Sequence, residues 1–324
     1  MRLFGLKGFG VTIITALLLP ISGQIASSQT TRTIKIIVPS TAGGGADILA
    51  RLLADQISRA QGVTLVVENR PGAGNTIGTE AAARATPDGT TLLINTPEFV
   101  INPHLRKVNY DALTSFEPVC YLVRSPQLLV VNSNSPYRTP AELLDGARAK
   151  PGELTLASAG PASSPHLAFE TLKSAAKVNM TYVPYPGSTP AVNALLGGHV
   201  TAVLASYPNV VEHVRTGKLR ALVTASPKRI EELPDVLTIA ELGFKDYEAD
   251  LWFGVMAPAK TSNDMIRQIQ GWFAAALQIP EIRSKLAIQG LFPVGTCGSE
   301  FGDFIRKQYE ESGRIIREAK IKGQ

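Results

Sequence analysis

The chain has 324 residues, with 32 Lys or Arg and 27 Asp or Glu, which gives a formal net charge of +5 at pH 7. The basic residues are scattered, and no run of them could follow a phosphate backbone, so the composition argues against nucleic-acid binding. No apolar run is long enough to cross a bilayer, and the length exceeds what one compact core usually holds. We therefore expect two lobes and no membrane-spanning helix.

The first residues have the three-part layout of a secretory signal. Arg2 and Lys7 precede an uncharged run over 9–19, and small residues follow that run. We expect cleavage after Ser28, with cleavage after Ala26 as the alternative. The mature protein is therefore expected in the periplasm.

Short β-branched runs then alternate with amphipathic stretches, a pattern typical of strand–helix units on a mostly parallel sheet. Strands are predicted, in chain order, over 34–38, 63–67, 91–94, 154–157, 180–183, 200–204 and 219–224. The tail is predicted to form amphipathic helices over 262–278 and 298–320. Crossovers between the lobes are expected near 122–131 and 248–254, which makes the second lobe an insertion in the first.

Four of the predicted strands end in a loop of small residues with a helix directly behind it. These loops span 39–47, 69–75, 158–164 and 185–189. Parallel strands place such loops at one edge of a sheet, and the first turn of each helix has free backbone N–H groups, so this edge suits a carboxylate. Taken singly, each loop is also explained as an ordinary turn that needs glycine for its geometry.

Three side chains are predicted to cap these helices. Ser164 stands before Pro165 and Thr189 before Pro190, and a hydroxyl followed by Pro at the first helical position is typical of a helix start. Asp47 is placed to cap the first helix in the same way. Two such loops from each lobe would line a cleft with backbone donors and hydroxyls, and with few full charges.

The histidines and cysteines leave two questions open. His166 either donates to an anion in the cleft or packs at the start of its helix. The other three histidines have no partner at metal-ligand spacing, so no metal site is expected. Cys120 and Cys297 are the only cysteines, and both a disulfide and two buried thiols are compatible with the sequence.

Motifs for cofactors and catalysis are weak or absent. Gly72, Gly74 and Gly78 follow a strand as in a dinucleotide-binding fingerprint, but no acidic residue marks the end of the next strand. No G-x-S-x-G motif occurs, and Ser163 and Ser164 are too close in sequence to the following histidine to specify a nucleophile–base pair. We expect no cofactor and no catalysis, with an exported hydrolase as the remote alternative.

An ordered set of motifs resembles the Bug-type solute-binding receptors of tripartite tricarboxylate transporters. The resemblance covers nearly the whole mature chain, through the segments 38–47, 67–74, 83–89, 158–167, 185–188, 197–200, 217–222 and 252–254. It implies an α/β fold of the two-lobed Venus-flytrap type, similar to the type II periplasmic binding proteins, with the ligand in the interlobe cleft. The expected domains are a signal peptide over 1–28, a first lobe over 29–128 and 252–324, and a second lobe over 129–251.

The resemblance also implies a function without chemistry. Such a receptor captures a small carboxylate, such as a dicarboxylate or an aromatic carboxylate, and delivers it to the membrane permease subunits of the transporter. A monomer is expected. The alternative is a ligand sensor that signals to a membrane kinase, which the sequence does not distinguish from a transport receptor.

The loops that carry the resemblance supply the expected ligand contacts. In the first lobe these are Ser40, Thr41, Ala42, Gly43, Gly44, Asp47, Gly74, Asn75 and Thr76. In the second lobe they are Ser158, Ala159, Ala162, Ser163, Ser164, His166, Tyr185, Gly187, Ser188, Thr189 and Ser206. Ser40 stands where many relatives carry an aromatic residue, and the segment 204–207 lacks an Asp that many of them place there, which favours a plain or aromatic carboxylate over an amino-bearing ligand.

Overall fold

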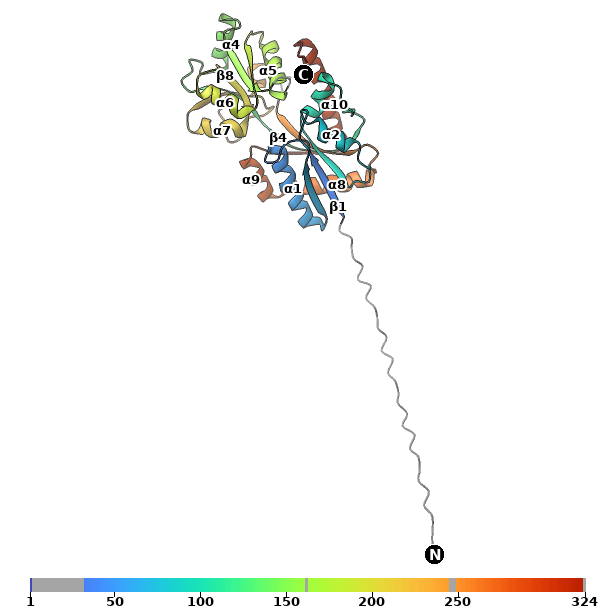
Figure 1. Ribbon diagram of the computed structural model, residues 1–324. Coiled ribbons are helices and arrows are strands. Elements are labelled where there is room, and N and C mark those ends of the chain that lie inside the picture. The colour runs from blue at the N-terminus through green and yellow to red at the C-terminus, as the bar shows by residue number, and fades with distance from the viewer. Residues whose placement is uncertain (2–31, 161–162, 245–248, 323–324) are drawn as a thin grey trace. The chain divides into compact units, whose positions relative to one another are not determined.

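The computed structural model describes Met1 and residues 32–160, 163–244 and 249–322 (Figure 1). The predicted signal segment, apart from Met1, and the predicted ligand residue Ala162 lie outside the described residues. Two sheets, each covered by helices, make up residues 32–324 as one compact unit. Among the described residues, no helix is both long and apolar enough to cross a membrane.

The first sheet has six strands in the order β11-β4-β10-β3-β1-β2. β1 pairs in parallel with β2 and β3, whereas β10 is antiparallel to β3 and β4, and β11 is antiparallel to β4. The strands are β1 (Thr33–Val38), β2 (Thr64–Asn69), β3 (Thr91–Asn95), β4 (Phe116–Ser125), β10 (Leu251–Pro258) and β11 (Phe292–Cys297).

The second sheet has five strands in the order β7-β6-β8-β5-β9. β6 pairs in parallel with β7 and β8, and β5 is antiparallel to β8 and β9. The strands are β5 (Gln127–Asn132), β6 (Thr155–Ala159), β7 (Thr181–Tyr185), β8 (Ala202–Ser206) and β9 (Leu219–Thr224). All seven strands predicted from the sequence are present, with ends that differ by at most two residues.

Helices cover both faces of the first sheet because its central strands are apolar on both sides. In β1, Ile36 faces a core made with α1 (Gly45–Gln61), α8 (Asn263–Gln278) and α9 (Pro280–Ile288). Ile37 faces the opposite core, made with α2 (Thr76–Ala83), α3 (Glu98–Leu105) and α10 (Ser299–Glu318). Strands buried on both faces are typical of parallel sheets with helical crossovers.

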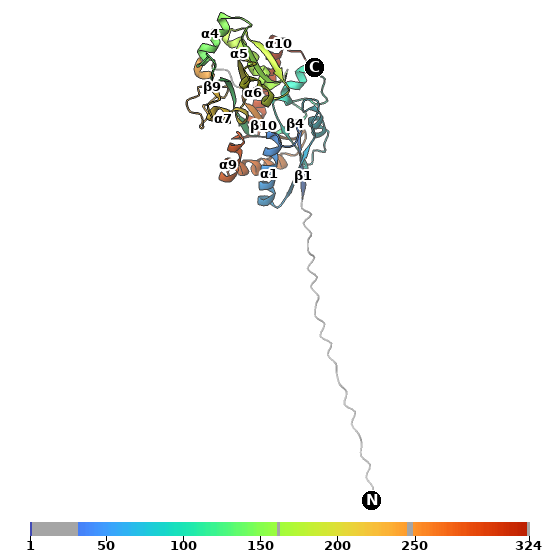
Figure 2. The same ribbon diagram turned by 60° about the vertical axis from the view of Figure 1, so that its left-hand side comes forward.

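The second sheet is covered in the same way. Leu129 of β5 faces α4 (Pro140–Ala149) and α5 (Ser164–Ala176), whereas Leu128 faces α6 (Ser188–Leu196) and α7 (Tyr207–Arg215). Figure 2 shows these four helices around the second sheet, with α1 and α9 beside the first. A short 3₁₀ helix, η1 (Ala240–Leu242), completes the described elements.

The chain passes between the two sheets at two neighbouring places. Only Pro126 separates β4 from β5, and the return runs from β9 to β10. Arg124 Nη1 lies 2.7 Å from Asp250 Oδ2, and Gln127 Nε2 donates to the carbonyl oxygen of Ala249 at 2.7 Å, so the two crossovers are bonded to each other. Burial raises the pKa of Asp250, against the opposing effect of Arg124. The residue limits of the lobes stay a prediction.

Cys120 and Cys297 form a disulfide between β4 and β11. The two residues are partners in the antiparallel register of these strands. This pairing answers the question that the sequence left open.

We predict that replacing both cysteines with Ser lowers the free energy of unfolding by about 2–5 kcal/mol, because the crosslink joins residues 177 apart in sequence and restricts the unfolded chain. Urea unfolding of the wild-type and variant proteins measures the difference. Adding a reductant to the wild-type protein should lower its midpoint to that of the variant. A wild-type midpoint that does not respond to reductant would contradict the prediction.

Candidate functional site

The parallel register of the first sheet gathers two predicted loops and the end of β3 at one edge. Val38 pairs with Asn69 at the ends of β1 and β2, and Ile37 pairs with Leu93 near the end of β3. The Asn69 side chain donates to the carbonyl oxygen of Ser40 at 3.1 Å, which ties the loop after β1 to the end of β2.

Asp47 supports the loop after β1 from inside α1. The helix begins at Gly45 with Gly44 as its N-cap, so the prediction that Asp47 caps it is wrong: Asp47 is its third residue. The carboxylate accepts the N–H of Gly43 at 2.9 Å and contacts Arg51 Nε at 3.0 Å. Burial would raise the pKa of Asp47, but the hydrogen bonds from Arg51 and Gly43 outweigh it, and the pKa lies below its usual value.

The loop before α2 is held in an unusual backbone conformation. Its residues with positive φ are Gly72, Ala73, Gly74 and Asn75. The Asn102 side chain donates to the Gly74 carbonyl at 2.6 Å, and the Asn75 side chain donates to Thr96 Oγ1 at 3.2 Å. These bonds join two adjacent loop residues to α3 and to the residue that follows β3, so the end of the loop that leads into α2 is anchored.

Three buried oxygens at this edge have no hydrogen-bond partner among the described residues. They are Ser40 Oγ, Thr76 Oγ1 and Asn95 Oδ1. Ser40 follows β1, Thr76 begins α2, and Asn95 ends β3. Because buried polar atoms in proteins are nearly always hydrogen-bonded, these oxygens mark the part of the edge that is suited to an external polar group.

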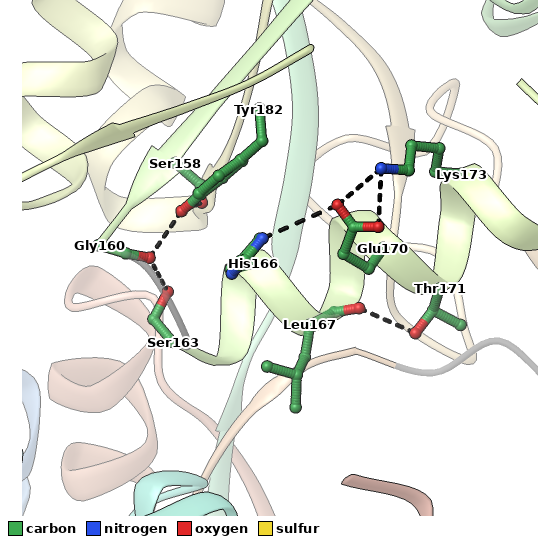
Figure 3. Close-up of polar contacts among 9 residues, drawn as sticks. All are labelled: Ser158, Gly160, Ser163, His166, Leu167, Glu170, Thr171, Lys173 and Tyr182. Carbon is green, nitrogen blue, oxygen red and sulfur yellow. Dashed lines mark hydrogen bonds and ion pairs between the residues drawn. The ribbon is translucent and has the colours of Figure 1, made fainter. Parts of the chain in front are cut away.

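In the second sheet, the hydroxyls of Ser158, Ser163 and Tyr182 hold the loop after β6 (Figure 3). The Tyr182 hydroxyl donates to the Gly160 carbonyl at 2.6 Å and lies 3.0 Å from Ser158 Oγ. Ser163 Oγ donates to the Gly160 carbonyl at 2.9 Å and to the Ala159 carbonyl. Ser158 is fully buried, and its hydroxyl contact is with Tyr182.

The predicted caps of α5 and α6 are displaced. The N-cap of α5 is Ser163 rather than Ser164, and its side chain bonds to carbonyls instead of capping the helix. The N-cap of α6 is Gly187, so Thr189 lies inside the helix as its second residue. Proline caused the error: its missing N–H is tolerated throughout the first turn, so it does not fix which residue comes first.

His166 packs against β7. Its ring stacks on Tyr182, with centroids 3.9 Å apart and planes inclined by 13°. Its Nε2 lies 3.8 Å from Glu170 Oε1 (Figure 3). Burial lowers the pKa of His166, against the opposing effect of Glu170.

The remaining predicted residues of the second lobe lie at the ends of neighbouring strands. Tyr185 ends β7 and is half-buried, and Ser206 ends β8 and precedes α7. Tyr207 is buried and packs edge-on against Phe292 of β11, with ring centroids 5.7 Å apart. Its ring therefore belongs to a contact between the two halves of the molecule.

Each sheet thus gathers its own predicted loops. A hollow of about 690 Å³ lies between α5 and α10, and none of the predicted ligand residues lines it. A smaller hollow beside it includes Ser164 in its wall. Within the described residues, no group of three or more His, Cys, Asp or Glu is arranged to hold a metal ion.

Similarity of the amino-acid sequence to known proteins identifies the family. The model of the tripartite tricarboxylate transporter family receptor matches residues 49–321. The chain belongs to this receptor family. It is 36% identical over 321 residues to Protein BugT of Bordetella pertussis, with 97% of each chain covered. The Bug-type resemblance predicted from the motifs is confirmed.

Solved structures of the receptor family share the fold. The periplasmic binding protein BugD is 32% identical, with 90% of this chain and 99% of that chain covered and a TM-score of 0.74. Rpa4515 of R. palustris, solved with adipate, is 32% identical, with 91% and 100% covered and a TM-score of 0.77. The predicted two-lobed α/β fold is confirmed, and membership of a receptor family agrees with the prediction that the chain is not an enzyme.

Several supporting residues of this receptor were missed by the sequence analysis. Asn102 and Tyr182 bond to the predicted loops from outside them, and Asn69, the first residue of one predicted loop, was not among the expected ligand contacts. Asn69 falls within a motif of the family resemblance, which was the one available signal. The other two carry no local pattern that separates them from ordinary helix and strand residues.

We predict that Gly78→Ala destabilises the protein by about 1–3 kcal/mol, because a Cβ there would lie 2.8 Å from the Arg70 carbonyl oxygen and from Pro39 Cα. The matched control is Gly271→Ala in α8, where a Cβ meets no atom within 4 Å and helix propensity favours Ala by up to about 1 kcal/mol. Urea unfolding compares the two variants. Equal midpoints would contradict the close approach of α2 to the loop after β1.

We also predict that His166 makes the protein less stable in acid. Its folded-state pKa lies below the usual value of 6.5, so the unfolded chain binds the proton first as the pH falls. The contribution of neutral His166 to the free energy of unfolding is complete above pH 6.5, and it is lost as the pH falls from there through the folded-state pKa. Free energies of unfolding on both sides of pH 6.5 should fall less with pH in His166→Asn than in the wild type. An equal fall would contradict the prediction.

Proposed function

We propose that the protein is a periplasmic receptor that captures a small dicarboxylate between its lobes and delivers it to a membrane permease. The observation that carries this proposal is the pair of unpartnered hydroxyls, Ser40 Oγ and Thr76 Oγ1, at an edge where α1 and α2 begin. A relative that is 32% identical over nearly its whole length was solved with adipate, which supports a dicarboxylate.

Neutral donors rather than full charges would bind the first carboxyl group. Arg51 is already bonded to Asp47 and Asn69, Arg70 is bonded to Glu68, and Arg106 Nη1 donates to the Ala73 carbonyl at 3.4 Å. The starts of α1 and α2 offer backbone N–H groups, and each helix end stabilises an anion by roughly 0.3–1 kcal/mol when exposed. The Ser40 and Thr76 hydroxyls add two directed donors.

The start of α5 would bind the second carboxyl group. The hydrogen-bond ladder of this helix begins with the N–H of Leu167, which donates to the Ser163 carbonyl at 3.0 Å. The N–H groups before it lie outside the ladder. Ser158, Tyr185 and Ser206 end neighbouring strands at the same edge, so a ligand that reaches both lobes would favour their closure.

Export to the periplasm is supported by three features. The first residues have the layout of a cleavable signal, the family name is that of a transporter receptor, and the disulfide suits an oxidising compartment. Delivery to permease subunits and action as a monomer follow from the same family assignment as parts of the proposal.

Calorimetric titration tests the ligand class. Adipate should bind the purified protein, and adipamide, which has the same length without charge, should bind at least tenfold more weakly, on the order of 1.4 kcal/mol. Equal binding of both compounds would contradict recognition of a carboxylate.

We predict that Thr76→Val weakens adipate binding by about 1–3 kcal/mol without lowering stability, because the hydroxyl has no partner to lose among the residues that the structure describes. The matched control is Thr261→Val, whose buried hydroxyl donates to the Pro258 carbonyl at 2.7 Å. The control should lose about 0.5–1.5 kcal/mol of stability and keep its affinity. Unchanged affinity in Thr76→Val would remove this hydroxyl from the site.

A further inference from the structure

The carbonyl of Gly160 accepts two hydroxyl hydrogen bonds, from Tyr182 at 2.6 Å and from Ser163 at 2.9 Å. We call these three groups the Gly160 clamp (Figure 3). The N–H of Gly160 is also used, because it donates to the Tyr185 carbonyl at 2.7 Å. Both polar groups of this residue are therefore fixed by the second lobe itself.

The direction of each hydrogen bond in the clamp follows from its chemistry. A carbonyl only accepts, so the single proton of the Tyr182 hydroxyl goes to Gly160. Ser158 must then donate its own proton to the Tyr182 oxygen, 3.0 Å away. The hydroxyls of Ser158 and Tyr182 form one ordered chain that ends on the Gly160 carbonyl.

The Tyr182 ring is held in place by α5. It stacks on His166 at 3.9 Å and on Phe169 at 5.8 Å between ring centroids. These two residues are three positions apart on one face of the helix, so the ring has little freedom to turn its hydroxyl away. The helix whose start is proposed to bind an anion therefore also orients the tyrosine.

The clamp determines what an anion would meet near the start of α5. The Ala159 carbonyl ends β6 and the Gly160 carbonyl follows it, at the edge where the ligand is proposed to bind, and exposed carbonyl oxygens repel a carboxylate. The hydroxyls of Ser163 and Tyr182 donate hydrogen bonds to these two carbonyl oxygens. Gly160 has a φ of +54°, a region open to glycine, so without the clamp its peptide groups have other conformations available.

We propose that Tyr182 is a positioning residue for ligand binding: it keeps the Gly160 carbonyl turned away from the anion, so that the start of α5 presents donors only. The proposal rests on the proposed function and names the residue that gives the second lobe its preference for a carboxyl group. Tyr182 itself does not touch the ligand.

The test compares Tyr182→Phe with the wild type, using adipate and hexanoate as probes. Phe keeps the stack on His166 and removes only the hydroxyl. Hexanoate has one carboxyl group and does not need an anion site in the second lobe. The dissociation constant for adipate should rise about five- to twentyfold, and that for hexanoate should stay within about twofold.

The matched control is Tyr110→Phe. It removes a buried tyrosine hydroxyl that donates to a backbone carbonyl, that of Phe99 at 2.9 Å, in the first lobe. It should leave the ratio of the two dissociation constants unchanged. Equal weakening of both acids by Tyr182→Phe, as from a general loss of structure, would overturn the proposal, and so would an unchanged adipate affinity.

Amide hydrogen exchange of the ligand-free proteins supplies a second measurement. Exchange at Gly160 and Ser163 should be faster in Tyr182→Phe than in the wild type and the control, and equal exchange would overturn the clamp. Failure of the wild type to bind either acid would instead overturn the proposed function. The wild-type titration alone identifies that outcome.

Discussion

Parallel strand pairing is the constraint on which both binding edges depend. In each sheet three neighbouring strands, β2-β1-β3 and β7-β6-β8, end at the same side, and helices begin beyond them. The register decides which residues meet there, as the pairs Val38–Asn69 and Ala159–Tyr185 show. A slip of one residue would turn every side chain of a strand to its other face, and the helices that cover both faces prevent it.

The polar residues at these edges divide into two kinds. Asp47 and Ser163 have their polar atoms bonded to the loops that they hold. The Ser40 and Thr76 hydroxyls have no partner among the described residues. The first kind fixes the backbone before any ligand arrives, which reduces the entropy lost on binding. It also keeps Asp47 paired with Arg51 and turned toward its own helix, where it repels an anion less.

Sequence patterns predicted the local parts of this structure and missed the parts that depend on distant pairing. β-branched runs with flanking turn residues were enough to predict seven strands. β4, β5, β10 and β11 were missed, and each pairs only with strands more than seventy residues away. The loops were found through their small residues, but Tyr182 was not: in sequence it is one aromatic residue in a strand, and its role arises only from the rings of α5 and from Gly160.

The crossovers limit how the lobes can move. Arg124 precedes Pro126 in one crossover, and Asp250 is the last residue of the other, where it also accepts the Ser226 hydroxyl. Separating this ion pair would leave a carboxylate that is only 2% exposed without its cation, at a cost of several kcal/mol. The two crossovers would therefore have to bend together in the proposed closure of the lobes. The disulfide joins β4, the strand that leads to Pro126, to its neighbour β11, so a covalent link holds the first sheet beside this crossover.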